Sequence, residues 1–244
     1  MKKIVFILFL FLTSGKMIYS QNINIGTRLG GFITGWENTG SFMTLQSRST
    51  RMWSYNIYGR QEILDNLYLG MDLGYSRSTA ELNVIEPERN IARGNGPTLG
   101  LWSIGPTIRK DFPLSNGKLG FHTSLSIPLN YTSFRNYEYS GSEFRTVVRV
   151  GDNQPITDIY VYGEDRIQRR FSVFVRPEVG VFYNVNARGR ISFDLLWGIN
   201  SGGPLVTRDF NEIIYEGETL NNNLHKFNGQ YFAFTIGYEY KLFK

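Results

Sequence analysis

The sequence predicts an all-β protein, an eight-stranded antiparallel up-and-down β-barrel that crosses a membrane, with short turns at one end and long loops at the other. Three observations predict this fold. The last strand alternates apolar and polar residues almost to the chain end, the composition favours strands and turns, and long and short connections alternate strictly. Helical periodicity is absent over any window of useful length, so we expect no helical domain.

The last predicted strand begins at Tyr231 and runs to the chain end. Its apolar members are Phe232, Phe234, Ile236, Tyr238, Tyr240 and Leu242, and its intervening members are Ala233, Thr235, Gly237, Glu239 and Lys241. A period of two places these sets on opposite faces of one strand. A soluble domain rarely ends on such an aromatic edge, because the edge invites aggregation. A strand that closes a barrel in lipid has this pattern, with its apolar face toward hydrocarbon and its polar face toward the lumen.

The composition supports the same fold class. The chain is 41% hydrophobic but 15% aromatic, and it has 26 glycines, a mixture that suits half-apolar strands joined by turns. The lack of Cys excludes disulfides, thiol catalysis, cysteine-based metal sites and a lipoprotein anchor on an N-terminal Cys. The net charge of +5 includes Lys2, Lys3 and Lys16, so the remaining chain carries 5 − 3 = +2 and gives no reason to expect nucleic acid as a partner.

The N-terminus predicts a secretory signal peptide at residues 1–20. Lys2 and Lys3 form a basic start, and residues 4–12 are an uninterrupted apolar run. That run is far shorter than the ~20 residues that a membrane-spanning helix needs. Small and polar residues then lead to Ser20 and Gln21, between which we expect cleavage. Residues 21–244 are expected to form one barrel domain.

Four strands are expected in the first half of the chain, each from an alternation of apolar and polar residues. They cover residues 23–35, 52–63, 67–78 and 98–110. Residues 36–49 are expected to form a loop, residues 64–66 a short turn, and residues 79–97 a long polar connection. The fourth strand ends before residues 115–118, where Asn116 and Gly117 give a typical hairpin signal.

Four more strands are expected at residues 119–134, 169–185 and 191–201 and from Tyr231 onward. A tight turn at residues 186–190 joins the sixth strand to the seventh. Residues 135–168 form the longest connection, and their pattern predicts a hairpin of residues 145–150 with residues 156–162. Residues 202–228 form another long connection, with a second hairpin that starts at residues 210–215.

Long and short connections therefore alternate along the chain. Four long connections are separated by three tight turns, and both chain ends fall on the side of the turns. This is the plan of outer-membrane barrels, which have short periplasmic turns and long extracellular loops. A soluble β-sandwich is the alternative, but strict alternation of connection length has no cause there.

The polar faces of the predicted strands carry charges of both signs that would meet inside the barrel. These residues are Arg28, Arg60, Asp72, Arg109, Arg176, Glu178, Asp194 and Glu239. Buried charges are tolerated when they are paired and hydrogen-bonded, and eight strands enclose just enough space for side chains to fill. We predict a structural network of ion pairs that plugs the barrel, and a polar path for ions is the alternative. Outward aromatic residues such as Trp53, Tyr75 and Trp197 are expected to form girdles at the membrane surfaces.

No catalytic, cofactor or metal site is predicted. His122 and Ser124 share a strand face and resemble part of the site of lipid A deacylase barrels, but this face points to the lumen and not to lipid. We expect His122 to be a lumen residue that is hydrogen-bonded to Glu178 or Asp194. His225 is expected in a polar loop, with no identified partner. Metal-ligand spacing is absent, and no helix follows the Gly-Gly pairs to bind phosphate.

The chain after residue 20 resembles the small outer-membrane β-barrel proteins of the OmpX, OmpA and OmpW types. Besides the features above, the pattern T-x-G-x-x-Y-x-L at residues 235–242 resembles their C-terminal insertion signal. That signal usually ends on an aromatic residue, whereas this chain ends on Lys244. The resemblance implies a location in the Gram-negative outer membrane, with outer-membrane lipid and the barrel-assembly machinery as partners. It implies no particular activity, because the family is functionally mixed.

The expected function is a structural or surface-binding role through the extracellular loops, because protruding hairpins expose sheet edges to a partner strand. The partner would be an extracellular protein or a surface ligand. The alternatives are a narrow pore or conduit for small hydrophobic molecules, and an accessory role in protein secretion as in the similar PorT-like barrels. A lipid-modifying enzyme is the least favoured alternative.

Overall fold

The structure is a computed structural model, and it describes residues 23–40, 45–86, 89–94, 96–115, 117–135, 143–150, 157–215, 217–221 and 223–242. The predicted signal peptide at residues 1–20 lies outside the described residues. All regular secondary structure in the described part is β-strand. No helix in that part is long and apolar enough to cross a membrane.

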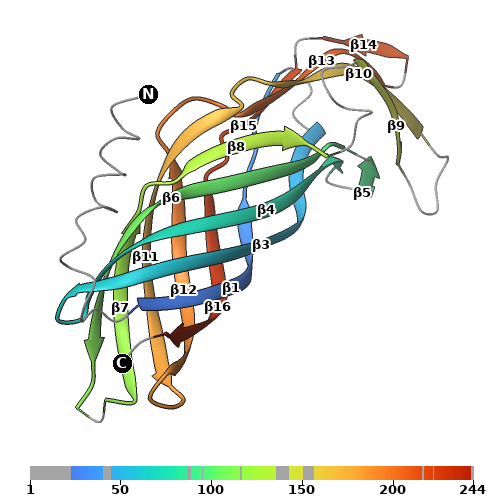
Figure 1. Cartoon of the computed structure of the whole chain (residues 1–244). Coiled ribbons are helices and arrows are strands. Elements are labelled where there is room, and N and C mark those ends of the chain that lie inside the picture. Colours follow the sequence, from blue (N-terminus) through green and yellow to red (C-terminus); the bar gives the residue numbers. More distant parts are fainter. Residues whose placement is uncertain are drawn as a thin grey trace, which may run out of the picture.

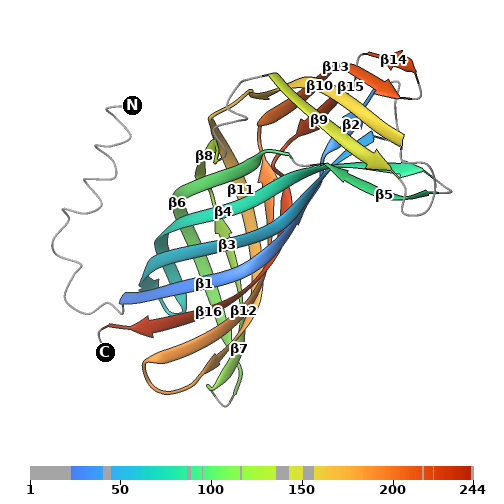
Figure 2. The ribbon, with the colours of Figure 1, turned by 90° about the vertical axis from the view of Figure 1, so that its right-hand side faces the viewer.

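Eight strands form a closed antiparallel barrel (Figure 1, Figure 2). They are β1 (Ile23–Thr34), β3 (Leu45–Leu64), β4 (Leu67–Glu86), β6 (Thr98–Pro113), β7 (Leu119–Ser126) with β8 (Leu129–Phe134) as one interrupted strand, β11 (Phe171–Asn184), β12 (Gly189–Asn200) and β16 (Tyr231–Lys241). Each strand pairs with its neighbours in this order, and β16 pairs with β1 to close the ring. The predicted all-β class and the eight-stranded up-and-down barrel are confirmed.

The tight turns lie at one end of the barrel, which we name the turn end (Figure 1). They join β3 to β4, β6 to β7 and β11 to β12. The start of β1 and the end of β16 lie there too, because the amide of Leu242 donates to the carbonyl of Ile23 and the amide of Lys241 donates to the carbonyl of Arg188. The longer connections leave from the opposite end, which we name the loop end.

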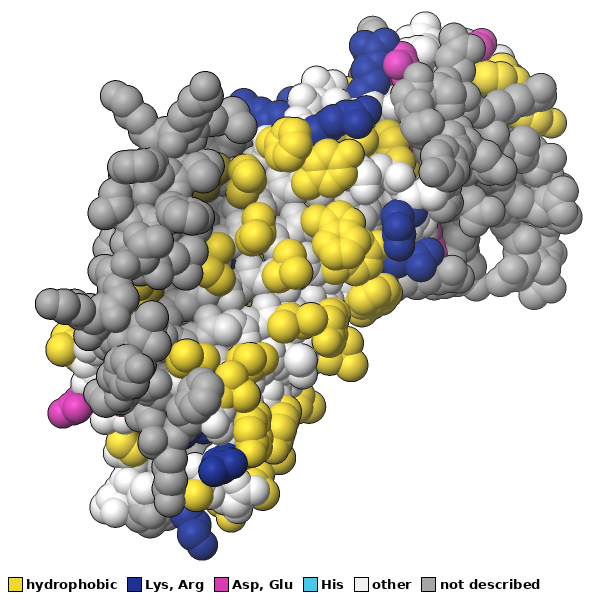
Figure 3. Space-filling model, in the orientation of Figure 1, with side chains coloured by type: hydrophobic (Ala, Val, Ile, Leu, Met, Phe, Trp, Pro, Cys, Tyr) yellow, Lys and Arg dark blue, Asp and Glu magenta, His cyan; other side chains and the backbone are white. Residues whose placement is uncertain are grey.

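The barrel wall is apolar outside and polar inside. Outward side chains such as Leu29, Trp102 and Ile236 are exposed, and Figure 3 shows apolar side chains spread over the outer wall. Inward positions carry buried Asn, Ser, Thr, Arg, Asp and Glu. A soluble protein has the reverse arrangement, whereas a barrel in lipid turns its apolar face to hydrocarbon. The outward face of each strand is therefore the one that the sequence pattern assigns to lipid.

A second sheet lies at the loop end, and we name it the outer sheet (Figure 1, Figure 2). Its strands, in spatial order, are β2 (Glu37–Thr39), β15 (Asn223–Phe227), β13 (Val206–Tyr215), β10 (Thr157–Ile167) and β9 (Glu143–Val150), with β14 (Glu218–Leu220) paired to β13. The hairpin of β9 with β10 has Thr157 opposite Val150, and the hairpin of β13 with β14 has Tyr215 opposite Glu218. Both hairpins that the sequence predicts are confirmed.

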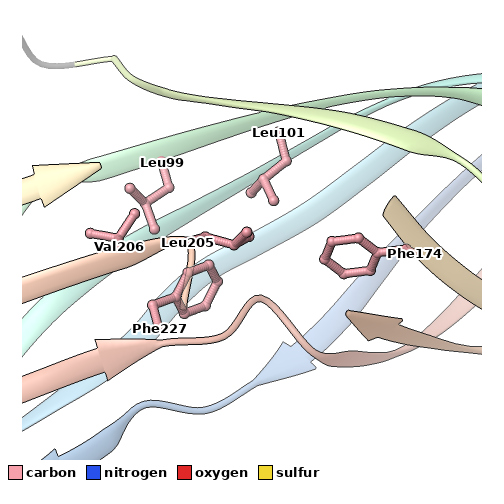
Figure 4. Packing of buried hydrophobic residues seen from close by; sticks show 6 residues of the cluster. All are labelled: Leu99, Leu101, Phe174, Leu205, Val206 and Phe227. Atoms are coloured by element: carbon pink, nitrogen blue, oxygen red, sulfur yellow. The ribbon is translucent and has the colours of Figure 1, made fainter. Parts of the chain in front are cut away.

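An apolar cluster closes the barrel at the loop end, and we name it the cap (Figure 4). Leu205, Val206 and Phe227, from the chain between β12 and β16, pack against inward residues of β6 and β11. The barrel residues are Leu99, Leu101 and Phe174. Trp36 covers the cluster, with its ring centroid 5.1 Å from that of Phe227. The connection before β16 thus folds back over the barrel mouth.

The prediction of loops at residues 36–49 and 79–97 is wrong in part. β3 already begins at Leu45, β4 continues to Glu86, and Leu45 lies opposite Val84 in the same ladder. β5 (Arg89–Gly94) then folds back on β4, and β2 lies within the first of these loops. Beyond the apolar wall a strand needs no apolar face, so the alternation on which the prediction rests disappears there although the pairing continues.

The prediction of the fifth strand as one continuous element at residues 119–134 is also wrong in detail. It is interrupted at Ile127 and Pro128, between β7 and β8. Pro128 has no amide hydrogen and cannot donate to a neighbouring strand. The wall stays closed because the amide of Ile127 donates to the carbonyl of Pro106 at 3.1 Å and the carbonyl of Pro128 accepts from Phe174 at 3.0 Å.

Candidate functional site

The eight charged residues that the sequence places in the lumen all lie inside the barrel and are buried. The structure arranges them in two layers. In the layer nearer the turn end, Arg60 and Arg109 share the carboxylate of Glu239, with N–O distances of 3.3 and 3.7 Å. Arg109 also pairs with Asp111 at 2.5 Å, and Arg190 pairs with both Asp111 and Glu239. This turn-end layer therefore consists of three arginines and two carboxylates.

The second, central layer is built around Arg28. Its guanidinium pairs with Glu178 and lies 3.8 Å from Asp72 and 4.0 Å from Asp194. Arg176 donates to Asp72 at 2.5 Å and to the hydroxyl of Ser126 at 2.8 Å. Two arginines thus face three carboxylates in this layer. Together the two layers contain five arginines and five carboxylates, so the ionised interior is neutral.

Aromatic rings hold the arginines in place between and beside the layers. The ring of Tyr58 lies between the layers, with the guanidinium carbons of Arg60 and Arg28 at 4.0 and 4.6 Å from its centroid. The guanidinium carbon of Arg190 lies 4.0 Å from the ring centroid of Phe182. Stacking on a ring stabilises a guanidinium while its edge stays free for carboxylates.

His122 belongs to the central layer. Its Nε2 atom lies 3.3 Å from Glu178 and 3.1 Å from Asp194, the two carboxylates that the sequence suggests as its partners. Gly180 makes this approach possible, because a Cβ atom there would lie 2.5 Å from both His122 and Asp194. The ring is fully enclosed and reaches no lipid-facing surface. The arrangement thus gives His122 two carboxylate partners inside the lumen.

His122, Glu178 and Asp194 also have the donor types that bind a divalent cation, and their donor atoms lie within 4.8 Å of one another. Sequence spacing alone gives no sign of this group, because its members come from β7, β11 and β12. Arg28 lies beside both carboxylates and already neutralises part of their charge. A further cation would meet that guanidinium at close range, so the chemistry of this group favours ion pairing over metal binding.

The described residues leave little open space along the barrel axis. An open polar vestibule of about 640 Å³ lies at the turn end and is bounded by residues such as Tyr68 and Arg190. On the loop-end side of the central layer, a cavity of about 20 Å³ lies between Arg176 and the inward rings of Phe174 and Tyr231. That volume holds about one water molecule. The two charged layers, the inward rings and the cap therefore fill the lumen between the vestibule and the outer sheet.

A second buried polar cluster lies between the loop-end part of β3 and the outer sheet. It consists of Ser47, Asp165, Arg208 and His225, and none of them is more than 2% exposed. Arg208 donates to Asp165 at 2.8 Å and to the Ser47 hydroxyl at 3.4 Å. The Ser47 hydroxyl lies 2.8 Å from Nδ1 of His225, and the His225 side chain also hydrogen-bonds to the backbone of Leu45. The cluster joins three strands of the outer sheet to the barrel.

Burial sets the charge state of this cluster. Burial, and after it the nearby Arg208 guanidinium, together lower the pKa of His225 to about 3. His225 is therefore neutral at pH 7, and its Nδ1 atom shares a hydrogen bond with the Ser47 hydroxyl. Burial raises the pKa of Asp165, against the opposing effect of Arg208. The expectation that His225 lies in a loop without a partner is wrong, because β15 carries it into the interior.

We expect the outer sheet to loosen from the barrel as the pH falls below about 6.5. The pKa of His225 is about 3 in the folded state and about 6.5 when exposed, so the exposed state binds the proton more tightly. The docked state is then fully stable above pH 6.5 and loses up to about 1.4 kcal/mol per pH unit below it. Asp165 acts in the opposite sense, because its raised pKa favours the docked state as the pH falls.

Amide hydrogen exchange in β13 and β15 at pH 7 and pH 5, corrected for the intrinsic rate, measures this effect. The His225→Gln variant keeps a hydrogen-bonding side chain and cannot titrate, so its protection should change little between the two pH values. Protection of β1 and β16 in the barrel wall serves as the internal reference. Equal pH dependence of β15 in the wild type and in His225→Gln would contradict the assignment.

Sequence reasoning missed several members of both clusters. Asp111 lies beyond the predicted end of its strand at residue 110, although it shares the inward face of Arg109 by period two. Arg190 falls in a predicted turn. Tyr58 lies on the polar face of β3, but its side chain is aromatic. No signal in the sequence joins Ser47 to His225, because 178 positions separate them.

Comparison with known proteins gives a fold and nothing finer. No protein-family model matches the sequence, and no curated protein matches it. The outer membrane protein OprG from Pseudomonas aeruginosa superposes with a TM-score of 0.56 at 7% identity, over 92% of this chain and 97% of that one. Neisserial surface protein A gives a TM-score of 0.40 at 14% identity, over 91% and 99%. The OprG match shows that the chain has the fold of a small outer-membrane β-barrel.

Proposed function

We propose that this chain is a closed barrel of the Gram-negative outer membrane that holds the outer sheet at the cell surface for a structural or surface-binding role. The charged interior is the observation that carries the proposal. Five arginines and five carboxylates pair across the lumen in two layers. Each charge in these pairs requires its partner, because a single unpaired charge in this interior is strongly unfavourable. In this proposal the interior stabilises the closed barrel, and the function of the protein is carried out by parts that lie outside the lumen.

The outer sheet is the part of the molecule that is available to a partner at the surface. Among the described strands, the terminal strands β9 and β2 each form a ladder on one side only, and β9 also lies near β5. An unpaired strand edge offers backbone groups to an added strand. The partner is in our proposal an extracellular protein or a surface ligand. Outer-membrane lipid and the barrel-assembly machinery complete the proposed partners, with no nucleic acid and no enzymatic activity.

The proposed location predicts which ends of the barrel are accessible on intact cells. Ala187 lies in the β11–β12 turn and Glu218 begins β14, and both side chains are exposed. The chain has no Cys, so one introduced thiol gives an unambiguous label. We expect Glu218→Cys to react with a membrane-impermeant maleimide on intact cells, and Ala187→Cys to react only after the outer membrane is permeabilised. Labelling of Ala187→Cys on intact cells would show that the turn end faces outward and that the proposed topology is reversed.

A narrow pore or conduit for small hydrophobic molecules is the second candidate. The observation that favours it is the apolar lining of the lumen toward the loop end, where Phe32, Leu196 and Ala233 form an inward cluster. The cap lies on the loop-end side of this lining, and the charged layers lie toward the turn end. A hydrophobic molecule would have to displace both to pass. An accessory role in secretion is compatible with the outer sheet, but no residue favours it specifically.

We expect the refolded protein to give no steady conductance in a planar lipid bilayer. The reason is that both charged layers would have to separate before ions could pass. An open porin, added to the same bilayer afterwards, establishes that insertion and sensitivity are sufficient. Regular single-channel steps from the wild-type protein would remove the closed-barrel proposal and favour the pore.

A further inference from the structure

Aromatic side chains mark the border of the apolar wall toward the loop end. Tyr75 on β4 lies opposite Trp102 on β6, which in turn lies opposite Tyr131 on β8. The ring centroids of Tyr75 and Trp102 are 4.7 Å apart, and Trp53 adds a further ring at 5.5 Å from Tyr75. Tyr and Trp collect where hydrocarbon meets the polar headgroups. This girdle therefore lies at headgroup depth on the loop-end side of the membrane.

Two arginines lie on the loop-end side of this girdle. Arg77 occupies the next outward position after Tyr75 on β4, and Arg135 follows directly after β8. Gly100 lies between them on β6, opposite both Arg77 and Ser133. Because Gly100 has no side chain, Arg135 can fold over it: a Cβ atom there would lie 3.4 Å from Cγ and Cδ of Arg135. Figure 3 shows basic side chains along this border of the apolar wall.

Tyr75 brings the donors together. The guanidinium carbon of Arg135 lies 5.3 Å from the ring centroid of Tyr75. The Tyr75 hydroxyl and Nε of Arg77 are both buried and have no hydrogen-bond partner among the described residues. The described part of the chain also shows no ion pair for Arg77 or Arg135, whereas every lumen arginine pairs with a carboxylate. The three side chains thus present donors and no matching acceptor.

We propose that Arg77, Arg135 and Tyr75 bind a phosphate of an anionic lipid headgroup in the leaflet at the loop end. Guanidinium groups bind phosphate through paired, charge-assisted hydrogen bonds, and the Tyr75 hydroxyl adds a third donor. The site lies on the outward wall at headgroup depth, so a membrane lipid reaches it without leaving the bilayer. In the outer membrane the lipid is a phosphorylated glycolipid of the lipid A class. This lipid assignment rests on the proposed location of the barrel.

Lipid retention by the purified barrel in nanodiscs tests the site. The nanodiscs contain phosphatidylcholine with either bis-phosphorylated lipid A or the same lipid A after dephosphorylation, and native mass spectrometry counts the lipids that stay bound. We expect the wild type to retain the phosphorylated form in preference. The double variant Arg77→Gln/Arg135→Gln should weaken that retention by about tenfold or more, because it removes both guanidinium groups that form charge-assisted hydrogen bonds with the phosphate. Tyr75→Phe should weaken it to a smaller extent.

Arg188→Gln is the matched control, because Arg188 is exposed at the turn end, far from the site. This substitution should leave lipid retention unchanged. Heat-modifiable migration of each variant on a gel establishes that the barrel is folded. Unchanged retention in the double variant, or an equal loss in Arg188→Gln, would overturn the site. Equally tight binding of inorganic phosphate in lipid-free micelles would overturn the assignment to a lipid. Failure of the location proposal is a separate result, because it is measured by fractionation and labelling of cells.

Discussion

We expect Ile236→Arg to abolish assembly of the barrel. Ile236 lies near the middle of β16, is 62% exposed, and has the outward residues Leu29 and Phe193 opposite it on β1 and β12. Its side chain therefore faces hydrocarbon on a strand that closes the ring. An arginine on the lipid face costs about 2–4 kcal/mol near mid-membrane, a large part of the stability of a domain of this size. Folded barrels migrate differently from boiled ones on a gel, and this difference should be lost.

Thr235→Ser is the matched control on the next residue. Thr235 is 1% exposed, points into the lumen and donates to Asp194 at 3.4 Å. Serine keeps that hydroxyl, so folding should be nearly unchanged. Tyr240→Ala and Leu242→Ala should slow assembly by weakening the terminal signal, with less effect on the finished barrel. A heat-modifiable Ile236→Arg protein in the outer-membrane fraction would show that the assigned face of β16 is wrong.

The barrel itself could be predicted because one physical rule governs every strand. Lipid outside and packed side chains inside force a period of two, and this period alone places Arg28 and Glu178 inward and Ile236 outward. The same rule identifies which charges can meet in the lumen, although it does not say which pairs form. Arg28 pairs with Glu178 across 150 positions of sequence, a contact that depends on the register of all the strands between them.

This alternation of apolar and polar residues holds only within the apolar wall. The strands beyond the wall could therefore not be predicted from it. β3 and β4 continue beyond the wall without an apolar face, and the sequence pattern predicts loops for these outer parts, within residues 36–49 and 79–97. The polar cluster that attaches the outer sheet contains Ser47 and His225, which are polar residues in polar segments. Burial gives them their role, and burial there follows from packing of two sheets whose partners the sequence pattern does not specify.

The lumen should respond strongly to the loss of its central arginine. Arg28 is 3% exposed and faces the carboxylates of Asp72, Glu178 and Asp194. The Arg28→Ala variant leaves these negative charges with Arg176 as the remaining arginine of their layer. Removal of one partner from a buried ion pair costs on the order of 3–5 kcal/mol. We therefore expect a large fall in the urea midpoint of unfolding in detergent micelles, with the wild-type barrel as reference.

Arg166→Ala provides the comparison, because Arg166 pairs with Glu164 on the exposed face of the outer sheet, where screening by water leaves such a pair little effect. Its midpoint should match that of the wild type. The double variant Arg28→Ala/Glu178→Gln should recover part of the loss, since it removes one unpaired charge together with the arginine. If Arg28→Ala and Arg166→Ala have equally small effects, water must reach the central layer and solvate its carboxylates. In that case the lumen is hydrated, and the pore becomes the better account of what the barrel does.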